Sequence, residues 1–268
     1  MLIDAHAHLD KYGPQDEDGL ESAIAEITQH KIFTISNSMD LASYERNLEI
    51  SKRCAWVLPT FGVHPWNASQ YTDCLGDLNK AIEQSPMLGE IGLDHFFVKD
   101  ASAYTAQRKV FECFLSAARE QGKIVNLHTK GAEREVLELL ERHKLSRVIV
   151  HWYSGPLDVF QELVARRMYF TVGIELLYSK HIRTIAQAIP SRQLLTETDN
   201  PGGPKEFIGK LGMPVLLKDV VRGLAEARNT TTEAIVETVQ ANLAELTRDD
   251  PWLTDTQRKI SGEWQNGR

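Results

Sequence analysis

The sequence opens with IDAHAH at residues 3–8, a short apolar run that ends in two histidines. Side chains two residues apart on a β-strand point to the same side, so we expect His6 and His8 to project in one direction. Two convergent imidazoles supply half of a metal site. The other ligands should then stand at the ends of other strands. The residues found there are Glu90, His128, His151 and Asp199.

Short apolar runs alternate with amphipathic stretches as far as about residue 228. In those stretches apolar residues recur three and four positions apart, which predicts helices. Strands that are apolar on both faces and separated by helices indicate an α/β protein with a closed parallel (β/α)8 TIM barrel. The 268 residues match the roughly 250 residues of such a barrel. The predicted strands are Leu2–His6, Phe33–Asn37, Trp56–Val63, Met87–Leu93, Ile124–His128, Val148–His151, Tyr169–Gly173 and Leu194–Thr198.

The alternative fold is an open doubly wound sheet, which would show the same alternation. A Gly-rich phosphate loop after the first strand would favour it, but His6-Ala7-His8 occupies that place. No linker or repeat divides the chain, so we expect a single barrel domain over residues 1–248. Its closing helices are predicted at Val215–Ala227 and Thr232–Leu246. The polar segment 249–268 is expected to be a partly disordered tail or a contact for a partner.

The composition is that of a globular protein, with 42% hydrophobic and 25% charged residues. Three scattered cysteines without CxxC spacing fit a reducing compartment. We find no basic-then-apolar leader and no run of about 18 apolar residues, so we expect a cytoplasmic protein that does not bind membranes. A net charge of −7 disfavours a long basic nucleic-acid groove. It still allows nucleic acid to be held at one end by a few cations and metal ions.

Five of the nine histidines, His64 among them, fall at or just after the end of a predicted strand. In a barrel these ends meet on one face. Imidazole and carboxylate ligands suit Zn²⁺, Mn²⁺, Fe²⁺ or, with more water ligands, Mg²⁺. A catalytic ion keeps one coordination position free for water or substrate, so four histidines and two carboxylates are too many ligands for one such ion. They are the right number for two ions that share a carboxylate. The predicted metal ligands are His6, His8, Glu90, His128, His151 and Asp199.

Six motifs follow one another between residues 4 and 201. They are DAHAHLD (4–10), GVHP (62–65), GEIGLD (89–94), LHTK (127–130), VHWYSG (150–155) and ETDNP (197–201). In this order they resemble the motifs of the TatD family of metal-dependent deoxyribonucleases, which are amidohydrolase-like TIM barrels. HxH alone is a weak signal, whereas the six motifs together are specific. Residues 241–243 (ANL) also resemble the Asn-containing terminal helix of that family.

The resemblance implies roles for these residues. One ion would be held by His6, His8, Glu90 and Asp199. A second would be held by His128 and His151, with Glu90 as the bridge between the ions. Asp199 matches the carboxylate that also orients and deprotonates the attacking water. His64 would face the scissile phosphate as a hydrogen-bond donor, so the expected catalytic residues are Asp199, Glu90 and His64.

The motifs also depart from the family pattern. Thr129-Lys130 stands where Ser-Arg is usual, and lysine lacks the bidentate fork of arginine. Trp152-Tyr153 stands where Cys-Phe is usual. The segment NPGGP at 200–204 stands where the family usually has Ala-Pro followed by bulky residues. These changes bear on the substrate and leave the metal ligands intact.

The departures suggest substrate contacts. Lys130 and Lys205 are the local cations for a phosphate, although loop lysines are usually solvated. Trp152 and Tyr153 could stack on a base or pack on the barrel rim. The pair Phe96-Phe97 could line the mouth.

Strand alternation gives candidates for orienting the ligands. Asp4 shares a face with His6, and Glu197 shares one with Asp199, so either could accept the free N–H of a ligand imidazole. Glu197 could equally pair with a lysine or arginine. Asp94 shares a face with Glu90 but could instead cap a turn.

The function expected from this sequence is a DNase that removes nucleotides from free single-stranded 3′ ends, with water activated by two divalent ions (Mg²⁺, Mn²⁺ or Zn²⁺). Its alternative is a metal-dependent hydrolase of a non-nucleic ester, lactone or amide, because fold and ligands are shared across such chemistries. A third interpretation is a partner-dependent subunit of a larger complex, which only the polar tail supports.

Overall fold

Each of the eight predicted apolar runs forms a parallel strand in the computed structural model, which describes residues 1–13 and 17–260. Most residues of these strands are buried, as expected for strands covered on both faces. The strands are β1 (Leu2–Ala7), β2 (Ile32–Asn37), β3 (Val57–Thr60), β4 (Leu88–Gly92), β5 (Val125–His128), β6 (Val148–Val150), β7 (Tyr169–Val172) and β8 (Leu194–Thr196).

The strands form two parallel sheets, ordered β1-β2-β3 and β4-β5-β6-β7-β8, and two seams join them. At the first seam Phe61 pairs with Leu88, and the Gly89 N–H donates to the Phe61 carbonyl at 2.8 Å. At the second seam the Asp199 N–H donates to the His6 carbonyl at 2.9 Å. The sheet therefore closes into the predicted (β/α)8 barrel.

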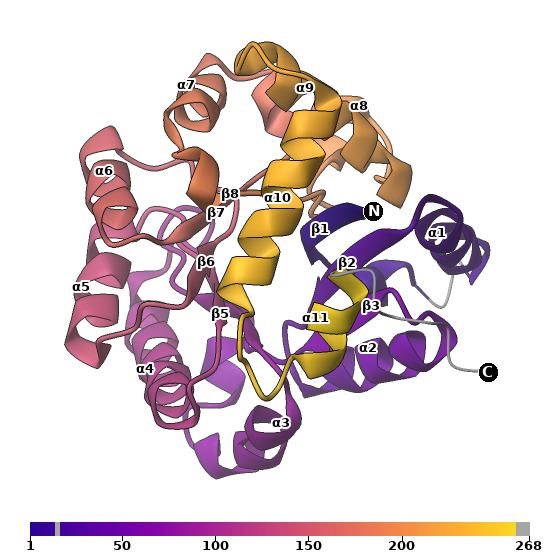
Figure 1. The fold of residues 1–268 in the computed structure, drawn as a ribbon. Coiled ribbons are helices and arrows are strands. Elements are labelled where there is room, and N and C mark those ends of the chain that lie inside the picture. Colours follow the sequence, from indigo (N-terminus) through magenta and orange to yellow (C-terminus); the bar gives the residue numbers. More distant parts are fainter. Residues whose placement is uncertain (14–16, 261–268) are drawn as a thin grey trace.

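Helices surround the barrel (Figure 1). The predicted apolar stripe of the longest of them, α4, is buried from Val110 to Ala118, and that helix ends at Gly122, whose φ of 65° suits a residue without Cβ. The helices are α1 (Glu17–His30), α2 (Leu41–Arg53), α3 (Asn79–Gln84), α4 (Tyr104–Gln121), α5 (Glu133–His143), α6 (Leu157–Ala165), α7 (Lys180–Ala188), α8 (Lys205–Ile208), α9 (Leu217–Ala227), α10 (Thr232–Leu246) and α11 (Thr254–Ile260).

Helix α10 lies across the amino-terminal ends of the strands (Figure 1). The Asn242 side chain donates to the Leu194 carbonyl at 2.7 Å, and Gln240 donates to the carbonyl of Met1. This helix closes one end of the barrel, so the carboxyl ends of the strands are left for a site.

The third strand is shorter than predicted. The apolar run Trp56–Val63 leaves the ladder after Thr60 because the chain there presses against β4. A Cβ on Gly62 would lie only 2.6 Å from the Glu90 nitrogen, so only glycine permits this approach. The close contact brings the His64 loop next to β4.

The first part of the polar segment beyond residue 248 packs against the barrel. Leu253 is buried, and the buried Asp250 carboxylate lies 2.6 Å from the Arg147 guanidinium. The Lys123 ammonium stands 3.9 Å above the Trp252 ring. Helix α11 follows, and residues 261–268 of the predicted tail lie outside the described residues.

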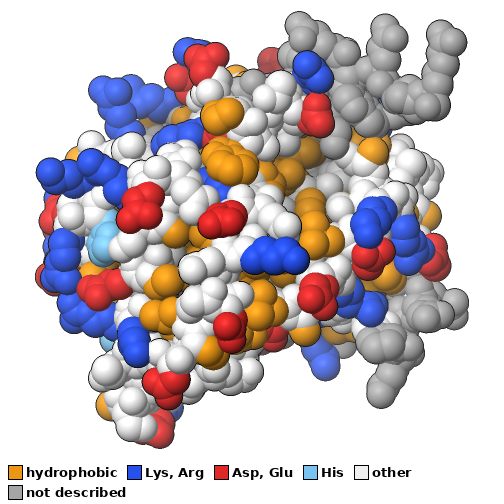
Figure 2. Space-filling view, turned by 90° about the horizontal axis from the view of Figure 1, so that it is seen from below, with side chains coloured by type: hydrophobic (Ala, Val, Ile, Leu, Met, Phe, Trp, Pro, Cys, Tyr) orange, Lys and Arg blue, Asp and Glu red, His pale blue; other side chains and the backbone are white. Residues whose placement is uncertain are grey.

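The surface seen in Figure 2 carries Lys and Arg side chains interspersed with Asp and Glu around scattered hydrophobic groups. Among the residues that the structure describes, no helix combines the length and hydropathy that a membrane span requires.

Candidate metal centre

The six predicted metal ligands come together at the carboxyl ends of the strands. His6 lies on β1, Glu90 on β4 and His128 at the end of β5; the others stand one to three residues beyond a strand end. A cavity of about 820 Å³ is lined by five of them, and the sixth, His6, is fully buried behind it. The ligands beyond strand ends are His8, His151 and Asp199.

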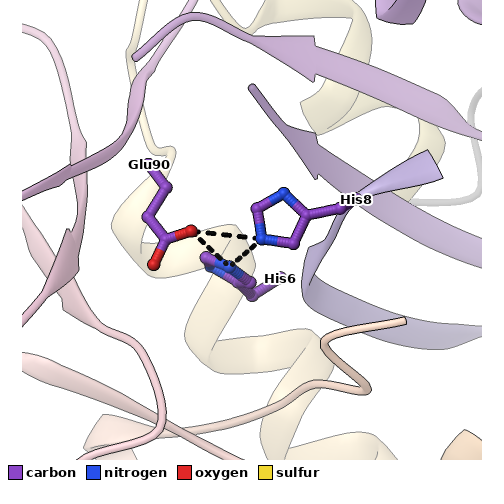
Figure 3. A group of neighbouring side chains, drawn as sticks. All are labelled: His6, His8 and Glu90. Atoms are coloured by element: carbon purple, nitrogen blue, oxygen red, sulfur yellow. Dashed lines mark hydrogen bonds and ion pairs between the residues drawn. The ribbon is translucent and has the colours of Figure 1, made fainter. Parts of the chain in front are cut away.

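The first group of donor atoms surrounds one carboxylate oxygen of Glu90. Its Oε2 lies 3.1 Å from His8 Nε2 and 3.5 Å from His6 Nε2, and the two imidazole nitrogens are 3.3 Å apart (Figure 3). Asp199 Oδ1 completes the group, 3.4 Å from His8 Nε2 and 3.8 Å from His6 Nε2. These are the four residues predicted for the first ion.

The second group surrounds the other oxygen of the same carboxylate. Glu90 Oε1 lies 2.9 Å from His128 Nδ1 and 3.3 Å from His151 Nε2. His64 Nε2 is also near, 3.5 Å from this oxygen and 3.3 Å from His128 Nδ1. Glu90 therefore faces one group with each oxygen, which is the arrangement that a bridging carboxylate needs.

Hydrogen bonds behind the imidazoles fix how they face the centre. The Nδ1–H of His8 donates to the Asn37 carbonyl at 2.9 Å, because a carbonyl can only accept. The Nδ1–H of His151 donates to the Glu197 carboxylate at 3.0 Å. In each ring the other nitrogen is left to present its lone pair to the centre.

The remaining two imidazoles are held in the same way. His6 Nδ1 is 3.0 Å from Asn126 Oδ1; the Asn126 amide donates to the Ala5 carbonyl, so its oxygen accepts from His6. The Nε2–H of His128 donates to Asp94 at 3.0 Å, which leaves Nδ1 for the centre. In its neutral form, each of the four imidazoles therefore turns an acceptor atom inward.

Convergent lone pairs and carboxylates repel one another unless positive charge lies between them, so the donor set fits cations. Two ligands bound at 2.0–2.1 Å to a tetrahedral ion stand about 3.4 Å apart, and somewhat closer on an octahedral one. The first group spans 3.1–3.8 Å. Spacing and chemistry both suit a divalent metal.

His64 differs from the four other histidines. Its Nδ1 accepts a hydrogen bond from the Trp66 N–H at 3.2 Å, so in the neutral ring Nε2 carries the proton. Burial lowers the pKa of His64 to about 4, and this keeps the ring neutral at pH 7. His64 lines the cavity and carries its N–H on the nitrogen that lies nearest to His128 and Glu90. Its contact with a phosphate stays a prediction.

The carboxylates shift the pKa values of the centre. Burial alone would lower the pKa of His8, but Asp199 and Glu90 outweigh it and raise this pKa to about 9. Glu197 and Glu90 likewise raise the pKa of His151 to about 10 against the effect of burial. Without a cation, protons on these two rings supply positive charge among the carboxylates.

The two carboxylates of the centre differ in access. Both line the cavity, but the side chain of Glu90 is 3% exposed and that of Asp199 is 19% exposed, so Asp199 is the more accessible carboxylate. Asp199 has a φ of 52°, a left-handed conformation that costs a non-glycine residue about 1–2 kcal/mol. Burial raises its pKa, but His8 and His151 outweigh burial and lower it to about 2.

The predicted orienting residues fare differently. Glu197 does hold a ligand imidazole, and it also accepts from the Thr171 hydroxyl at 2.6 Å. Asp4 does not: its carboxylate accepts from the N–H and hydroxyl of Thr198, and Asn126 holds His6 instead. Asp94 fills both predicted roles, because it holds His128 and also accepts from the N–H groups of a turn.

The predicted substrate contacts are only partly gathered at the cavity. Lys130 and Trp152 line it, and the Lys130 ammonium donates to the Trp152 carbonyl at 2.7 Å. Tyr153 is buried between Phe160 and Phe170, so it packs in the hydrophobic core and does not contact the cavity. Lys205 is exposed on α8 and does not belong to the cavity lining, and its contact with substrate stays a prediction.

Sequence reasoning missed several participants. Asn126 meets His6 across the barrel, from β5 to β1, and the Asn37 carbonyl meets His8 from the neighbouring strand β2. Both contacts join residues far apart in the sequence, so local pattern could not find them. Trp66 and Phe207 also line the cavity, Trp66 from the segment after β3 and Phe207 from α8. Phe207 follows the unusual NPGGP segment, which was the one available signal.

Comparison with known proteins gives a consistent result. The family model described as TatD related DNase matches residues 3–248. The uncharacterized metal-dependent hydrolase YabD of Bacillus subtilis is 28% identical, over 92% of this chain and 99% of its own. The human deoxyribonuclease TATDN3 is 23% identical, over 91% of this chain and 94% of its own.

Solved structures agree in fold. The crystal structure of YjjV, a TatD homologue from Escherichia coli, superposes with a TM-score of 0.82 at 25% identity. The match covers 91% of this chain and 97% of that one. The barrel described above is therefore the TatD and amidohydrolase type of TIM barrel.

Gly203 provides a test of the Asp199 position. A Cβ at residue 203 would collide with the Asp199 carboxylate and lie 2.8 Å from the Trp152 ring. We expect Gly203→Ala to weaken Mn²⁺ binding by about 10- to 100-fold, as measured by calorimetric titration. Gly202→Ala is the matched control, because nothing lies within 4 Å of its added Cβ. Equal affinities of the two variants would contradict a role of Asp199 in metal binding.

Metal binding should also depend on pH. A cation must displace protons from His8 and His151, whose pKa values of about 9 and 10 lie above the ordinary 6.5. We therefore expect the affinity of stripped protein for Mn²⁺ to rise by about tenfold per pH unit for each proton released, from pH 6.5 upward. Calorimetry in buffers of different ionisation enthalpy counts these protons.

The same two groups link pH to stability in the metal-free protein. Because their folded pKa values are raised, their stabilisation is complete below pH 6.5 and is lost as pH rises through about 9. A Mn²⁺ affinity that does not change with pH would show that His8 and His151 are neutral before metal binds.

Proposed function

The chain belongs to the TatD-related DNase family of metal-dependent hydrolases, and we propose that it hydrolyses phosphodiester bonds of DNA, removing nucleotides from a free single-stranded 3′ end. One observation carries the proposal. Glu90 directs each of its oxygens at a separate group of inward-facing imidazoles, and an open cavity adjoins both groups.

The geometry supports the following assignment of residues to two cations. His6, His8 and Asp199 would hold one ion, His128 and His151 the other, and Glu90 would bridge them. Divalent ions such as Mg²⁺, Mn²⁺ or Zn²⁺ bound there would activate a water molecule and offset negative charge on the phosphate. The hydrogen bonds behind each imidazole hold these ligands in place before substrate arrives.

Asp199 is suited to take the proton of the attacking water. It is the more exposed carboxylate of the pair, and it lines the cavity that a substrate would enter. The Asp199 N–H is bonded to β1, so the carboxylate has a fixed position beside the metal groups. Glu90 is less accessible, and in this proposal it contributes to catalysis as the ligand shared by both ions.

His64 is suited to donate a hydrogen bond to a phosphate oxygen. Its Nε2–H faces the cavity beside the second group, and its low pKa keeps it a neutral donor. Lys130, held by Trp152 and Ser154, adds positive charge on the same wall. These groups favour an anionic substrate over a neutral ester or amide.

DNA is supported as the substrate by the family and by the human relative named a deoxyribonuclease. A single strand suits a recessed site, because the ligands lie at the bottom of a cavity in the barrel mouth. The aromatic ring of Trp152 on the cavity wall can contact an unpaired base.

The deciding experiment uses metal-stripped protein re-supplied with Mg²⁺, Mn²⁺ or Zn²⁺ separately, with 3′-labelled single-stranded DNA as substrate. We expect label release with at least one metal and release before any internal cleavage. Asp199→Asn should lower kcat by about 10²- to 10⁴-fold. Generic ester and amide substrates run in parallel, and activity on these without activity on DNA would overturn the proposal.

His64 gives a second prediction. We expect His64→Ala to lower kcat on DNA by about 10²- to 10³-fold, because a donor to the developing phosphate charge is lost. Mn²⁺ affinity should stay close to wild type, since His64 is assigned no metal. His64→Gln restores an N–H donor and should recover part of the loss. A large fall in Mn²⁺ affinity in either variant would show that His64 is a ligand.

A further inference from the structure

Three exposed aromatic side chains stand on one side of the cavity. Trp66 is 51% exposed, Phe96 56% and Phe97 57%, and all three line the cavity. The Phe97 ring lies 6.0 Å from Trp66 and 4.9 Å from Phe96, in edge-to-face contact with both. We call these three residues the aromatic rim.

One carboxylate ties the aromatic rim to the metal centre. Asp94 Oδ2 accepts from the Trp66 indole N–H at 2.7 Å and from His128 at 3.0 Å. Asp94 Oδ1 accepts from the N–H groups of Phe96 and Phe97 at 2.9 and 2.7 Å. The residue that orients a predicted metal ligand therefore also positions all three rings.

The loop that carries Phe96 and Phe97 is also held by the loop that follows β5. The His95 N–H donates to the Lys130 carbonyl at 2.8 Å. A Cβ on Gly131 would lie 2.9 Å from the Phe96 nitrogen, so the two loops touch at the backbone. Exposed rings held this firmly lose little entropy when a ligand covers them.

The aromatic rim lies across the barrel mouth from a second pair of aromatic residues, Trp152 and Phe207. Trp66 and Phe96 follow β3 and β4, whereas Phe207 follows β8. Strands four apart in an eight-stranded barrel are on opposite sides. Trp152 and Phe207, with ring centroids 6.0 Å apart, form the facing wall. The metal groups lie on the floor between two aromatic walls.

We propose that the aromatic rim is a stacking platform for one unpaired nucleobase of the substrate strand, next to the phosphate held at the metal centre. The inference rests on the proposed function. A base is the fitting occupant because the rings border the cavity over the metal groups, and every base offers a planar face. The exposed Lys99 ammonium, 4.7 Å above the Phe96 ring, places a cation where the strand leaves the cavity.

The experiment compares intact single strands with strands that carry one abasic nucleotide, placed one, two or three positions from the 3′ end. For wild-type protein we expect one position at which the missing base lowers kcat/KM by about 5- to 100-fold. In the variant Phe96→Ala/Phe97→Ala the same abasic strand should differ from the intact strand by less than about twofold. Both substitutions keep the backbone N–H groups that bind Asp94.

Trp252→Ala is the control, because Trp252 is 41% exposed but contacts the Gln121 carbonyl at the opposite end of the barrel. It should keep the abasic penalty of wild type. A penalty that is the same in wild type and in the Phe96/Phe97 variant at every position would overturn the platform while DNA hydrolysis stands. Wild-type protein that cleaves no DNA strand would overturn the proposed function and the platform with it.

Discussion

The hydrogen bond from the Asp199 N–H to the His6 carbonyl joins β8 to β1 and closes the barrel. Beside it the Asp4 carboxylate accepts both the N–H and the hydroxyl of Thr198. This seam brings Asp199 against His6 and His8, which come from the other end of the sequence. A barrel left open here would separate Asp199 from His6 and His8 and leave the first group of donor atoms incomplete.

The centre places buried acceptors close together, which is unfavourable without compensating positive charge. The protein meets this cost in two ways. Each of the four imidazoles is hydrogen-bonded on its outer nitrogen, so its inner nitrogen cannot turn away, and in the absence of metal His8 and His151 hold protons. Asp94 links the centre to the cavity edge, because it accepts hydrogen bonds from both His128 and the Trp66 indole. Metal chemistry and substrate contact thus share one network.

Much of this could be predicted from local pattern. The eight strands, the buried stripe on α4 and helix α10 follow from hydrophobic periodicity, which reports burial directly. The six ligands follow from the rule that strand ends meet on one face of a barrel. Sequence pattern could not predict contacts that cross the barrel. Asp4 was expected to accept the free N–H of His6, but Asn126 does so. The Asp4 carboxylate accepts instead from Thr198, where β8 meets β1. Sequence pattern also could not decide that Tyr153 packs in the core while the neighbouring Trp152 faces the cavity.

The sequence by itself determined the alternation of strands and helices and which residue types stand at the strand ends, because periodicity and motif order are properties of the chain. Only the tertiary structure decided which nitrogen of each histidine faces the centre, that His64 donates where the others accept, and that Asp199 is more accessible than Glu90. These depend on hydrogen bonds between residues far apart in sequence. Such contacts exist only once the barrel has closed, so no local pattern could contain them.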